Sequence, residues 1–479
     1  MPANFLHGVE TIRIEVGPRS VRLVKAAVSA CVGTAPTGPV NKPTLVLSDK
    51  DAARFGPYLS GFTIADALNA NFVQGRPHAG AVIVVNVLDP AVHRTQVTGE
   101  SLTFGAADNR ARLAHPGVMD LVVKSADGAT TYVLGADYTV DAVTGALTRV
   151  GTGAIPSGAT VDAGYFHADP TKVTAADIIG AVDGITGKRT GLQSLKDCHQ
   201  LFGFFPKRVI APGYSPLSFV STGLIAIAER IRARAYIDAP VGITPAETIA
   251  GRGPAGTINF NTSSLRARLC YPHVEVYDAE ADGTRLAPLS QYAAGVGNAS
   301  DLERGYWWSS SNREIRGIVG LERDLSAAIN DPASEVNLLN EVGITTVFNA
   351  FGTGHRLWGN RSAAWPTDTS PYNFENVLAV GDIVDESIEH ASLQYMDMPI
   401  DDPWIDAVTE MVNGFLRKLK GDGAILDGRC WYDPDDNPET EVAMGHVAFR
   451  RGYMSPLSAE RITNLVYLDL DYLKALGTK

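Results

Sequence analysis

Residues 81–88, AVIVVNVL, give the strongest constraint on the fold of this chain. They barely alternate between apolar and polar side chains, which is typical of a strand that is buried on both faces of a sheet. Strand-like runs at 28–33 and 44–47 and a helix-like run at 64–74 precede them. This order of elements predicts an α/β domain in which helices cover the sheet.

The composition changes after Asp89-Pro90. Residues 91–170 are rich in Thr, Gly, Ala and Asp, and Asp-Gly and Thr-Gly turn signals separate their short β-type runs. This spacing predicts a small β-sandwich or barrel. Because the α/β pattern resumes after Asp169-Pro170, we expect the all-β domain to be inserted in a surface loop of the α/β domain.

Helical periodicity and short apolar runs alternate again beyond the insert. No period of about 20–50 residues recurs, which excludes a solenoid. At 479 residues the chain is expected to form about two to four domains. We predict helices at 175–182, 192–202 and 219–232, and strands at 208–211, 235–237 and 269–277.

Segments in which apolar and polar residues alternate lie near both ends of the chain, at 9–16 (VETIRIEV) and at 461–470 (RITNLVYLDL). A further one lies at 442–450. A single strand cannot bury its own apolar face. It can be a terminal strand of the chain's own sheet, or an arm that adds to the sheet edge of another subunit. The candidate arm residues are Ile12, Ile14, Val16, Leu465, Val466, Tyr467 and Leu468.

A strong amphipathic helix is predicted at 403–420, with Asp402 as its cap and Gly421 at its end. Its last turn is basic, as the helix dipole favours. The basic residues are Arg417, Lys418 and Lys420.

Charge and cysteine content narrow the possible partners. The formal net charge of −12 disfavours binding to nucleic acid or anionic membrane. The four cysteines lie far apart, which fits reduced thiols. The longest apolar run, at 81–85, is shorter than the roughly 20 residues that cross a bilayer. With no signal peptide visible, we expect synthesis and retention in a cytoplasm.

No catalytic motif emerges from the sequence. Residues 251–256 satisfy G-x-G-x-x-G, but Pro254 stands where the helix should open and no strand precedes it. The acidic turn at 433–437 mimics the start of a calcium loop, yet Pro438 replaces the required glycine. Single histidines such as His355 and His446 lack a partner cluster. We therefore predict no catalytic residue, no cofactor site and no metal site.

The segment 338–362 predicts a strand, a glycine turn and a second strand, and it also carries a specific pattern. Its Leu-Asn, Gly-Ile, Gly and Trp-Gly-Asn-Arg-Ser elements resemble the signature of contractile-tail sheath proteins. Residues 288–312 match a second pattern of that family, and 373–377 resemble the family's strand after the Trp-Gly turn. The signature residues are Asn340, Gly343, Gly354, Trp358, Gly359 and Arg361.

The resemblance implies a mixed α/β, multi-domain structural subunit with extended terminal β-arms. We expect an N-terminal arm at 1–25, an α/β core domain at 26–90 and 171–355, an all-β insert at 91–170, and a C-terminal domain at 356–479 that holds the basic helix and the second arm.

The resemblance also implies a function. Subunits would stack as hexameric rings around a tail tube protein, contact baseplate and tail terminator proteins, and contract to drive the tube through the host envelope for genome ejection. They would assemble in the host cytoplasm, enter the virion tail, and turn Arg417, Lys418 and Lys420 towards the tube. Alternatives are a non-phage, tailocin-like injection system, an α/β enzyme with an undetected site, and a host-surface binding module built on the insert.

Overall fold

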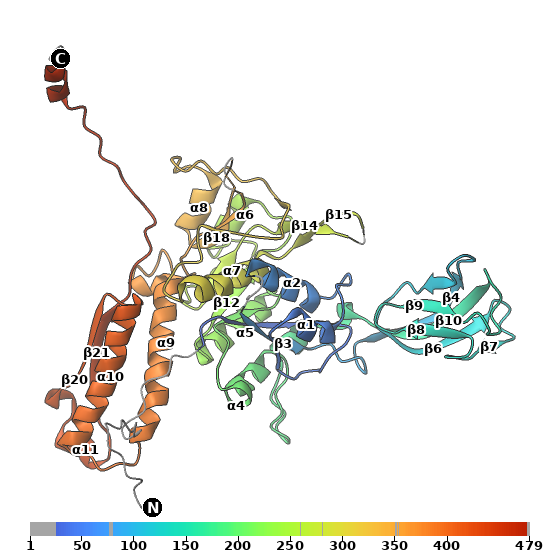
Figure 1. The fold of residues 1–479 in the computed structure, drawn as a ribbon, viewed down its shortest axis with the longest axis horizontal. Coiled ribbons are helices and arrows are strands. Elements are labelled where there is room, and N and C mark those ends of the chain that lie inside the picture. The colour runs from blue at the N-terminus through green and yellow to red at the C-terminus, as the bar shows by residue number, and fades with distance from the viewer. Residues whose placement is uncertain are drawn as a thin grey trace, which may run out of the picture.

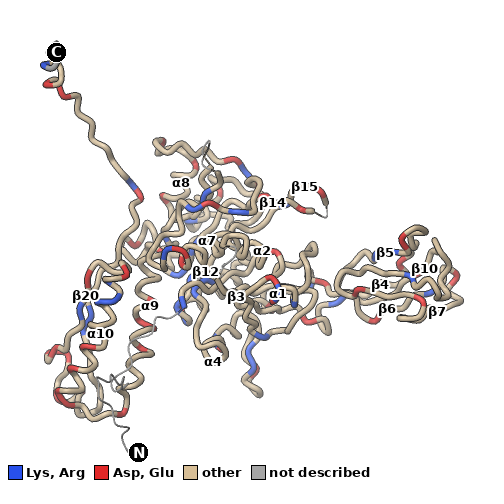
Figure 2. The backbone as a smooth tube through the Cα atoms, viewed as in Figure 1, with Lys and Arg blue, Asp and Glu red and all other residues tan. Residues whose placement is uncertain are grey.

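The computed structural model describes residues 25–75, 80–258, 260–279, 281–349, 352 and 354–476. A central α/β body carries a small β-domain on one side and a helical part on the other (Figure 1). Residues 461–469 run away from the body as an extended segment that leads into a 3-10 helix, Leu470–Ala475. Acidic and basic residues are interspersed over the body and the helical part rather than gathered on one face (Figure 2).

A nine-stranded sheet forms the centre of the body, in the order β16-β19-β18-β13-β12-β11-β1-β3-β2. Antiparallel strands close its edges: β2 (Thr44–Val46), β19 (Arg356–Trp358) and β16 (Arg313–Glu314). The parallel strands are buried along their whole length: β1 (Val28–Gly33), β3 (Ala81–Asn86), β11 (Arg208–Ile210), β12 (Arg234–Asp238), β13 (Ala267–Cys270) and β18 (Ile344–Phe348).

Strand β3 confirms the doubly buried strand that the sequence predicts. Its side chains alternate between two apolar clusters, with Val82 and Val84 in one and Ile83 and Val85 in the other. Asn86 ends the strand because its side-chain oxygen accepts hydrogen bonds from the backbone N–H groups of Ala35, at 3.0 Å, and Leu88, at 3.1 Å.

Helices cover both faces of this sheet. On one face α2 (Ile64–Gln74) packs beside α7 (Leu289–Arg304), and α5 (Ser218–Arg230) lies on the other. Helix α2 has the predicted bounds. The predicted helix at 192–202 is a 3-10 helix, Gly191–Asp197, followed by α4 (Cys198–Phe202). The remaining helices of the body are α1 (Asp49–Ala52), α3 (Ala175–Ile179), α6 (Pro245–Ala250) and α8 (Glu335–Glu341).

The strand predicted at 269–277 is wrong as a single element. Pro272 cannot donate a hydrogen bond to a sheet, and the chain leaves the central sheet there. Strand β13 ends before it, and β14 (Val274–Asp278) begins a separate three-stranded sheet with β15 (Gly283–Ala287) and β17 (Gly320–Leu321).

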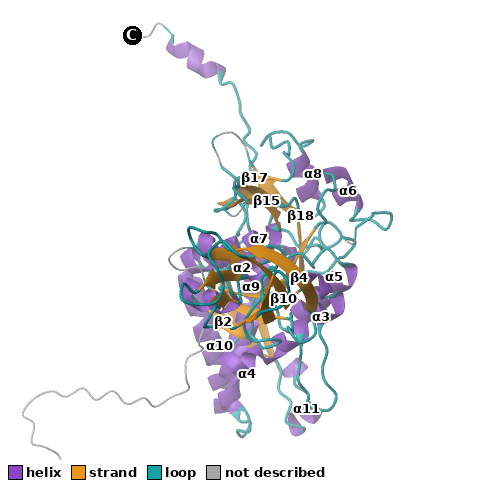
Figure 3. Ribbon diagram, turned by 90° about the vertical axis from the view of Figure 1, so that its right-hand side faces the viewer, coloured by secondary structure: helices purple, strands orange, loops and turns teal. Residues whose placement is uncertain are grey.

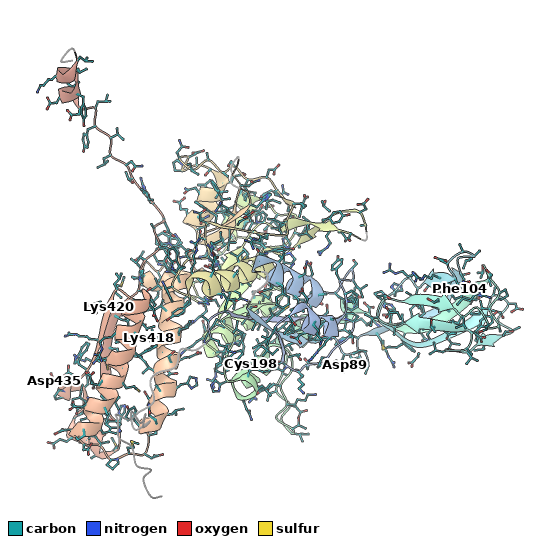
Figure 4. All side chains as sticks on the ribbon, in the orientation of Figure 1. Asp89, Phe104, Cys198, Lys418, Lys420 and Asp435 are labelled. Carbon is teal, nitrogen blue, oxygen red and sulfur yellow. The ribbon has the colours of Figure 1, made fainter. Side chains whose placement is uncertain are left out.

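Between residues 94 and 168 the insert consists of strands, turns and loops without a helix, as the sequence predicts. Two sheets, β4-β10-β6-β7 and β5-β9-β8, enclose an apolar cluster of their own, which includes Phe104 (Figure 4). Entry and exit strands pair, since Arg94 lies opposite Ala168. The strands are β4 (Arg94–Thr103), β5 (Arg110–Arg112), β6 (Val118–Ser125), β7 (Thr131–Tyr132), β8 (Tyr138–Asp141), β9 (Ala146–Arg149) and β10 (Thr160–Ala168).

The C-terminal part packs two long helices, α9 (Glu375–Ser392) and α10 (Asp402–Asp422), against a hairpin of β20 (Asp427–Tyr432) and β21 (Phe449–Met454). Helix α10 confirms the predicted amphipathic helix, with two corrections at its ends. Asp401 rather than Asp402 caps it, by accepting a 2.9 Å hydrogen bond from the backbone N–H of Trp404. Gly423, with φ of 82°, ends it instead of Gly421.

Two strands predicted in this part are wrong. Residues 373–377 are the end of a 3-10 turn and the start of α9. Residues 442–450 contain the end of α11 (Glu439–Ala443), a loop and only the start of β21. The Asn437 side chain holds that loop through hydrogen bonds with both backbone groups of Ala448, at 2.7 and 2.9 Å. Over the described ranges, no helix is long and apolar enough to span a membrane.

Candidate assembly interface

Three neighbouring strands of the central sheet each place one arginine in the protein interior. Arg208 on β11, Arg234 on β12 and Arg268 on β13 are at most 4% exposed. Arg208 lies directly opposite Arg234, and Arg268 lies opposite Tyr236 on β12. Buried charges are costly unless they are paired and hydrogen-bonded, so a set of partners is required.

Glu375, the first residue of α9, is the shared partner of the three arginines. It forms an ion pair with Arg268, lies 3.5 Å from the Nε atoms of Arg208 and Arg234, and accepts a 2.5 Å hydrogen bond from the Tyr236 hydroxyl. Burial raises the pKa of this carboxyl, but the three guanidinium groups outweigh burial and lower it from 4.5 to about 2. Glu375 is therefore a charged, buried link between the sheet and α9.

Two further acidic residues continue this contact along α9. Asp382 forms an ion pair with Arg266, and Glu386 accepts a 2.6 Å hydrogen bond from the buried Lys207. Spacings of seven and four residues place all three carboxylates on one face of the helix. We call these contacts the charged ladder; it comprises Glu375, Asp382 and Glu386 on α9 with Lys207, Arg208, Arg234, Arg266 and Arg268 on the body.

Of the predicted signature residues, Gly359 contacts this ladder directly. Gly359 has φ of 117°, and its carbonyl accepts a 2.6 Å hydrogen bond from Nη2 of Arg268. Trp358 stacks on Phe348 across the β18–β19 pair, with ring centroids 4.6 Å apart. Gly343 has φ of 77°, and a Cβ there would lie 2.9 Å from two carbonyl oxygens. Asn340 is on α8, and Gly354 lies in the β18–β19 loop with φ of 68°.

Arg361, the last signature residue, fixes the start of the C-terminal segment. Its guanidinium lies 4.0 Å from the ring centroid of Trp365 and 4.1 Å from that of Phe374. Its nitrogens donate to both carboxylate oxygens of Glu460, at 2.6 to 3.0 Å. Nearby, Asn360 donates a 3.0 Å hydrogen bond to Ser458. Residues 456–460 are thus anchored on the body.

The chain beyond this anchor is exposed and extends away from the body (Figures 1 and 3). The strand predicted at 461–470 is not formed in the single chain, because no described strand lies beside it. Its apolar side chains point into solvent: Leu465 is 77% exposed, Val466 84%, Tyr467 83% and Leu468 93%. The predicted N-terminal arm residues, Ile12, Ile14 and Val16, lie outside the described residues.

The β20–β21 hairpin offers a sheet edge in the same part of the molecule. Asn413 of α10 occupies both backbone groups of Cys430 on β20, at 2.7 and 3.0 Å. Strand β21 has no further strand on its outer side within the described residues. An unpaired edge of this kind can accept an extended segment of another chain.

The basic end of α10 is exposed, and each of its predicted contact residues has an acidic neighbour (Figure 4). Arg417 lies 3.1 Å from Glu410, Lys418 2.8 Å from Asp422 and Lys420 2.9 Å from Asp427. Exposed pairs of this kind contribute at most about 1 kcal/mol, so they can exchange partners readily.

The fragments that mimic ligand sites have structural explanations. Residues 251–256 follow a helix, α6, instead of the strand that a dinucleotide site needs. The acidic turn at 433–437 supplies Asp433 and Asp436 as partners for Arg450. The part of the chain that the structure describes holds no group of three or more metal-ligating side chains.

The sequence analysis did not identify the charged ladder. A signal was present, since each of three short, mostly apolar strands contains an arginine. Their partner Glu375 lies 107 residues from Arg268, and no local pattern connects the two.

Family comparisons cover most of the chain. The phage tail sheath protein central domain matches residues 171–363, and the phage tail sheath C-terminal domain matches residues 367–468. Residues 90–177, which include the insert, match a family of unknown function.

Individual relatives agree with these matches. The tail sheath protein of Burkholderia phage BcepMu is 55% identical over 477 residues, which is 99% of both chains. A putative prophage major tail sheath protein of Pseudomonas aeruginosa is 33% identical over 60% of this chain and 71% of its own length. Contracted sheaths of the extracellular contractile injection system PVC and of the anti-feeding prophage share the fold, each with a TM-score of 0.60 over 98% of this chain and 100% of the other, at 14% and 15% identity. The chain therefore belongs to the phage tail sheath family and is a structural subunit of a contractile tail sheath rather than an enzyme.

Proposed function

We propose that copies of this chain stack as hexameric rings around a tail tube and contract to drive the tube through the host envelope for genome ejection. The observation that carries the proposal is the C-terminal segment, which is anchored at 456–460 and exposes an apolar run directly beyond. A run of exposed leucine, valine and tyrosine is costly in water, so its natural environment is a neighbouring subunit.

The gain from docking this segment can be estimated. In an extended conformation alternate side chains face one way, so two of the four arm residues 465–468 would be buried on a partner. Full burial of such side chains contributes about 1.5–3 kcal/mol each, which gives roughly 3–6 kcal/mol per arm. Repeated over every subunit of a sheath, this energy keeps neighbouring subunits linked.

We infer that the outer edge of β21 receives an arm from a neighbouring copy, and that Ile12, Ile14 and Val16 belong to a second arm. The support for β21 is that Asn413 already occupies part of the β20 edge. On this proposal the division of the chain is an arm at 1–25, a core at 26–90 and 171–355, an insert at 91–170 and a C-terminal domain at 356–479.

The basic end of α10 is our candidate for the tube contact, because Arg417, Lys418 and Lys420 are exposed and weakly paired. Charge reversal at Lys418 and Lys420 is expected to reduce assembly on tubes while lowering the stability of the subunit only slightly, by about 1 kcal/mol or less per exposed position. Unchanged assembly of the reversed variant on tubes would contradict this contact. Baseplate and terminator proteins are proposed as the partners at the two ends of the stack, with assembly in the host cytoplasm.

A phage tail is favoured over a non-phage injection system. The relative that matches the whole chain at 55% identity is a phage protein, whereas the injection-system sheaths share only the fold at 14–15% identity. Capsid genes beside the gene for this chain would agree with the phage assignment, and their absence would favour an injection system.

Negative-stain electron microscopy tests the assembly proposal. The full chain is compared with a chain that stops after Glu460, which keeps the anchor but lacks the exposed run. We expect hollow, six-fold striated tubes from the full chain and none from the shortened one. Tubes from the shortened chain would contradict the arm proposal, and discrete monomers of the full chain under all conditions would contradict self-assembly.

A further inference from the structure

Two histidines meet where α4 of the body approaches the last turn of α9. His199 is on α4 and His390 is on α9, and their Nε2 atoms lie 3.3 Å apart. The ring planes differ by 7°, with centroids 4.9 Å apart, and Phe205 packs against the His199 ring at 5.4 Å. Both histidines reach solvent, so small ions have access to them.

The position of His390 continues the stripe of α9 that forms the charged ladder. It follows Glu386 by four residues, and therefore lies on the same face as Glu386 and Asp382. Those two carboxylates each meet a cation of the body. The pair of His199 and His390 differs, because it joins two groups of the same kind.

The separation of the two nitrogens fits a shared metal ion. Zinc bonds to imidazole nitrogen at about 2.0–2.1 Å in tetrahedral geometry, which places two ligand nitrogens roughly 3.3–3.4 Å apart. Imidazole is a preferred ligand for zinc, copper and nickel ions. The His χ2 torsion is broad, so ring rotation can turn both lone pairs towards one ion at little cost.

We propose that His199 and His390 form a two-histidine site for a divalent transition-metal ion of the zinc class. Water molecules complete the coordination, since the described residues provide no third metal-ligating side chain there. The ion cross-links the body to α9. The proposal does not depend on whether subunits stack as hexameric rings or surround a tail tube. It can therefore fail while the sheath assignment holds.

Calorimetric titration of tag-free full chain with zinc chloride at pH 7.5 tests the site. The variants are His199→Ala and His390→Ala, and the matched control is His446→Ala, an exposed histidine that contacts Glu441 elsewhere. We expect one zinc ion per chain, at least tenfold weaker binding in each site variant, and unchanged binding in the control. A zinc-dependent rise in melting temperature is expected for the wild type and the control only.

X-ray absorption of the zinc-loaded wild type is expected to show two imidazoles in the coordination shell. Absence of binding to the wild type would overturn the proposal, as would binding that survives in either site variant. Because both histidines reach solvent, the variants are expected to keep the circular dichroism spectrum of the wild type, which separates loss of the site from loss of the fold.

Discussion

Replacing Glu375 by glutamine is the sharpest test of the charged ladder. The change keeps the size of the side chain, but it removes the charge that three buried arginines share and turns one acceptor oxygen into an NH2 donor. Lowering the carboxyl pKa from 4.5 to about 2 corresponds to roughly 3 kcal/mol in favour of the folded, ionised state, at about 1.4 kcal/mol per pKa unit. Loss of one member of a buried pair typically costs about 3–5 kcal/mol, in agreement with that figure.

The pH dependence of this effect has a definite sign. A carboxyl with a lowered pKa in the folded state stabilises the protein fully above its unfolded pKa, and this contribution is lost as the pH falls through the folded value. The difference between wild type and Glu375→Gln is therefore expected to be constant near pH 7 and to shrink from about pH 4.5 towards pH 2.

Amide hydrogen exchange along α9 is the suitable assay, because a chain with several domains has no single free energy of unfolding. A loss of about 3 kcal/mol predicts exchange on the order of 100-fold faster in α9 at pH 7. The control is Asp422→Asn, which removes the exposed partner of Lys418 and is expected to cost less than about 1 kcal/mol. Exchange in Glu375→Gln that matches the control would refute the reasoning.

Three further changes test the anchor, the arm and the signature turn. Glu460→Ala removes the bidentate partner of Arg361, so limited proteolysis just beyond residue 455 is expected to accelerate several-fold in the unassembled subunit; an unchanged rate would contradict the anchor. Leu465→Asp is expected to abolish tubes in electron micrographs yet leave the subunit's melting temperature unchanged, since the side chain is 77% exposed. Gly343→Ala is expected to cost about 1–3 kcal/mol in thermal unfolding, because φ is 77° and the added Cβ meets two carbonyl oxygens; an unchanged melting temperature would disprove that strain.

Local patterns in the sequence were sufficient for elements whose environment repeats along the chain. Helix α2 has its predicted bounds, and β3 was predictable because both of its faces are apolar. Residues 373–377 became a helix start where a strand was predicted. The cause is distant: the backbone N–H of Glu375 bonds to the carbonyl of Asn360, and its side chain meets three strands.

The candidate interface could be predicted only in part. Composition and alternation identified the apolar C-terminal run, but alternation cannot show whether the partner strand belongs to the same chain. In the single chain residues 461–469 have no partner strand among the described residues and remain extended, and Leu470 begins a 3-10 helix. The arginines of the charged ladder left a signal in the sequence, but their pairing was beyond prediction, since no local period relates Arg268 to Glu375.

The anchor of the C-terminal segment also determines where tension enters the subunit. A neighbour that pulls on the segment loads Arg361, Asn360 and the adjacent Gly359, whose carbonyl is bonded to Arg268 of the central sheet. From there Glu375 carries the force into α9. The Arg361–Glu460 and Asn360–Ser458 contacts would share the pull at the anchor, and the contacts beyond Gly359 would pass it on one after another. The body of each subunit would thus stay rigid while the exposed segment flexes. Contraction would then be transmitted with little deformation inside each body.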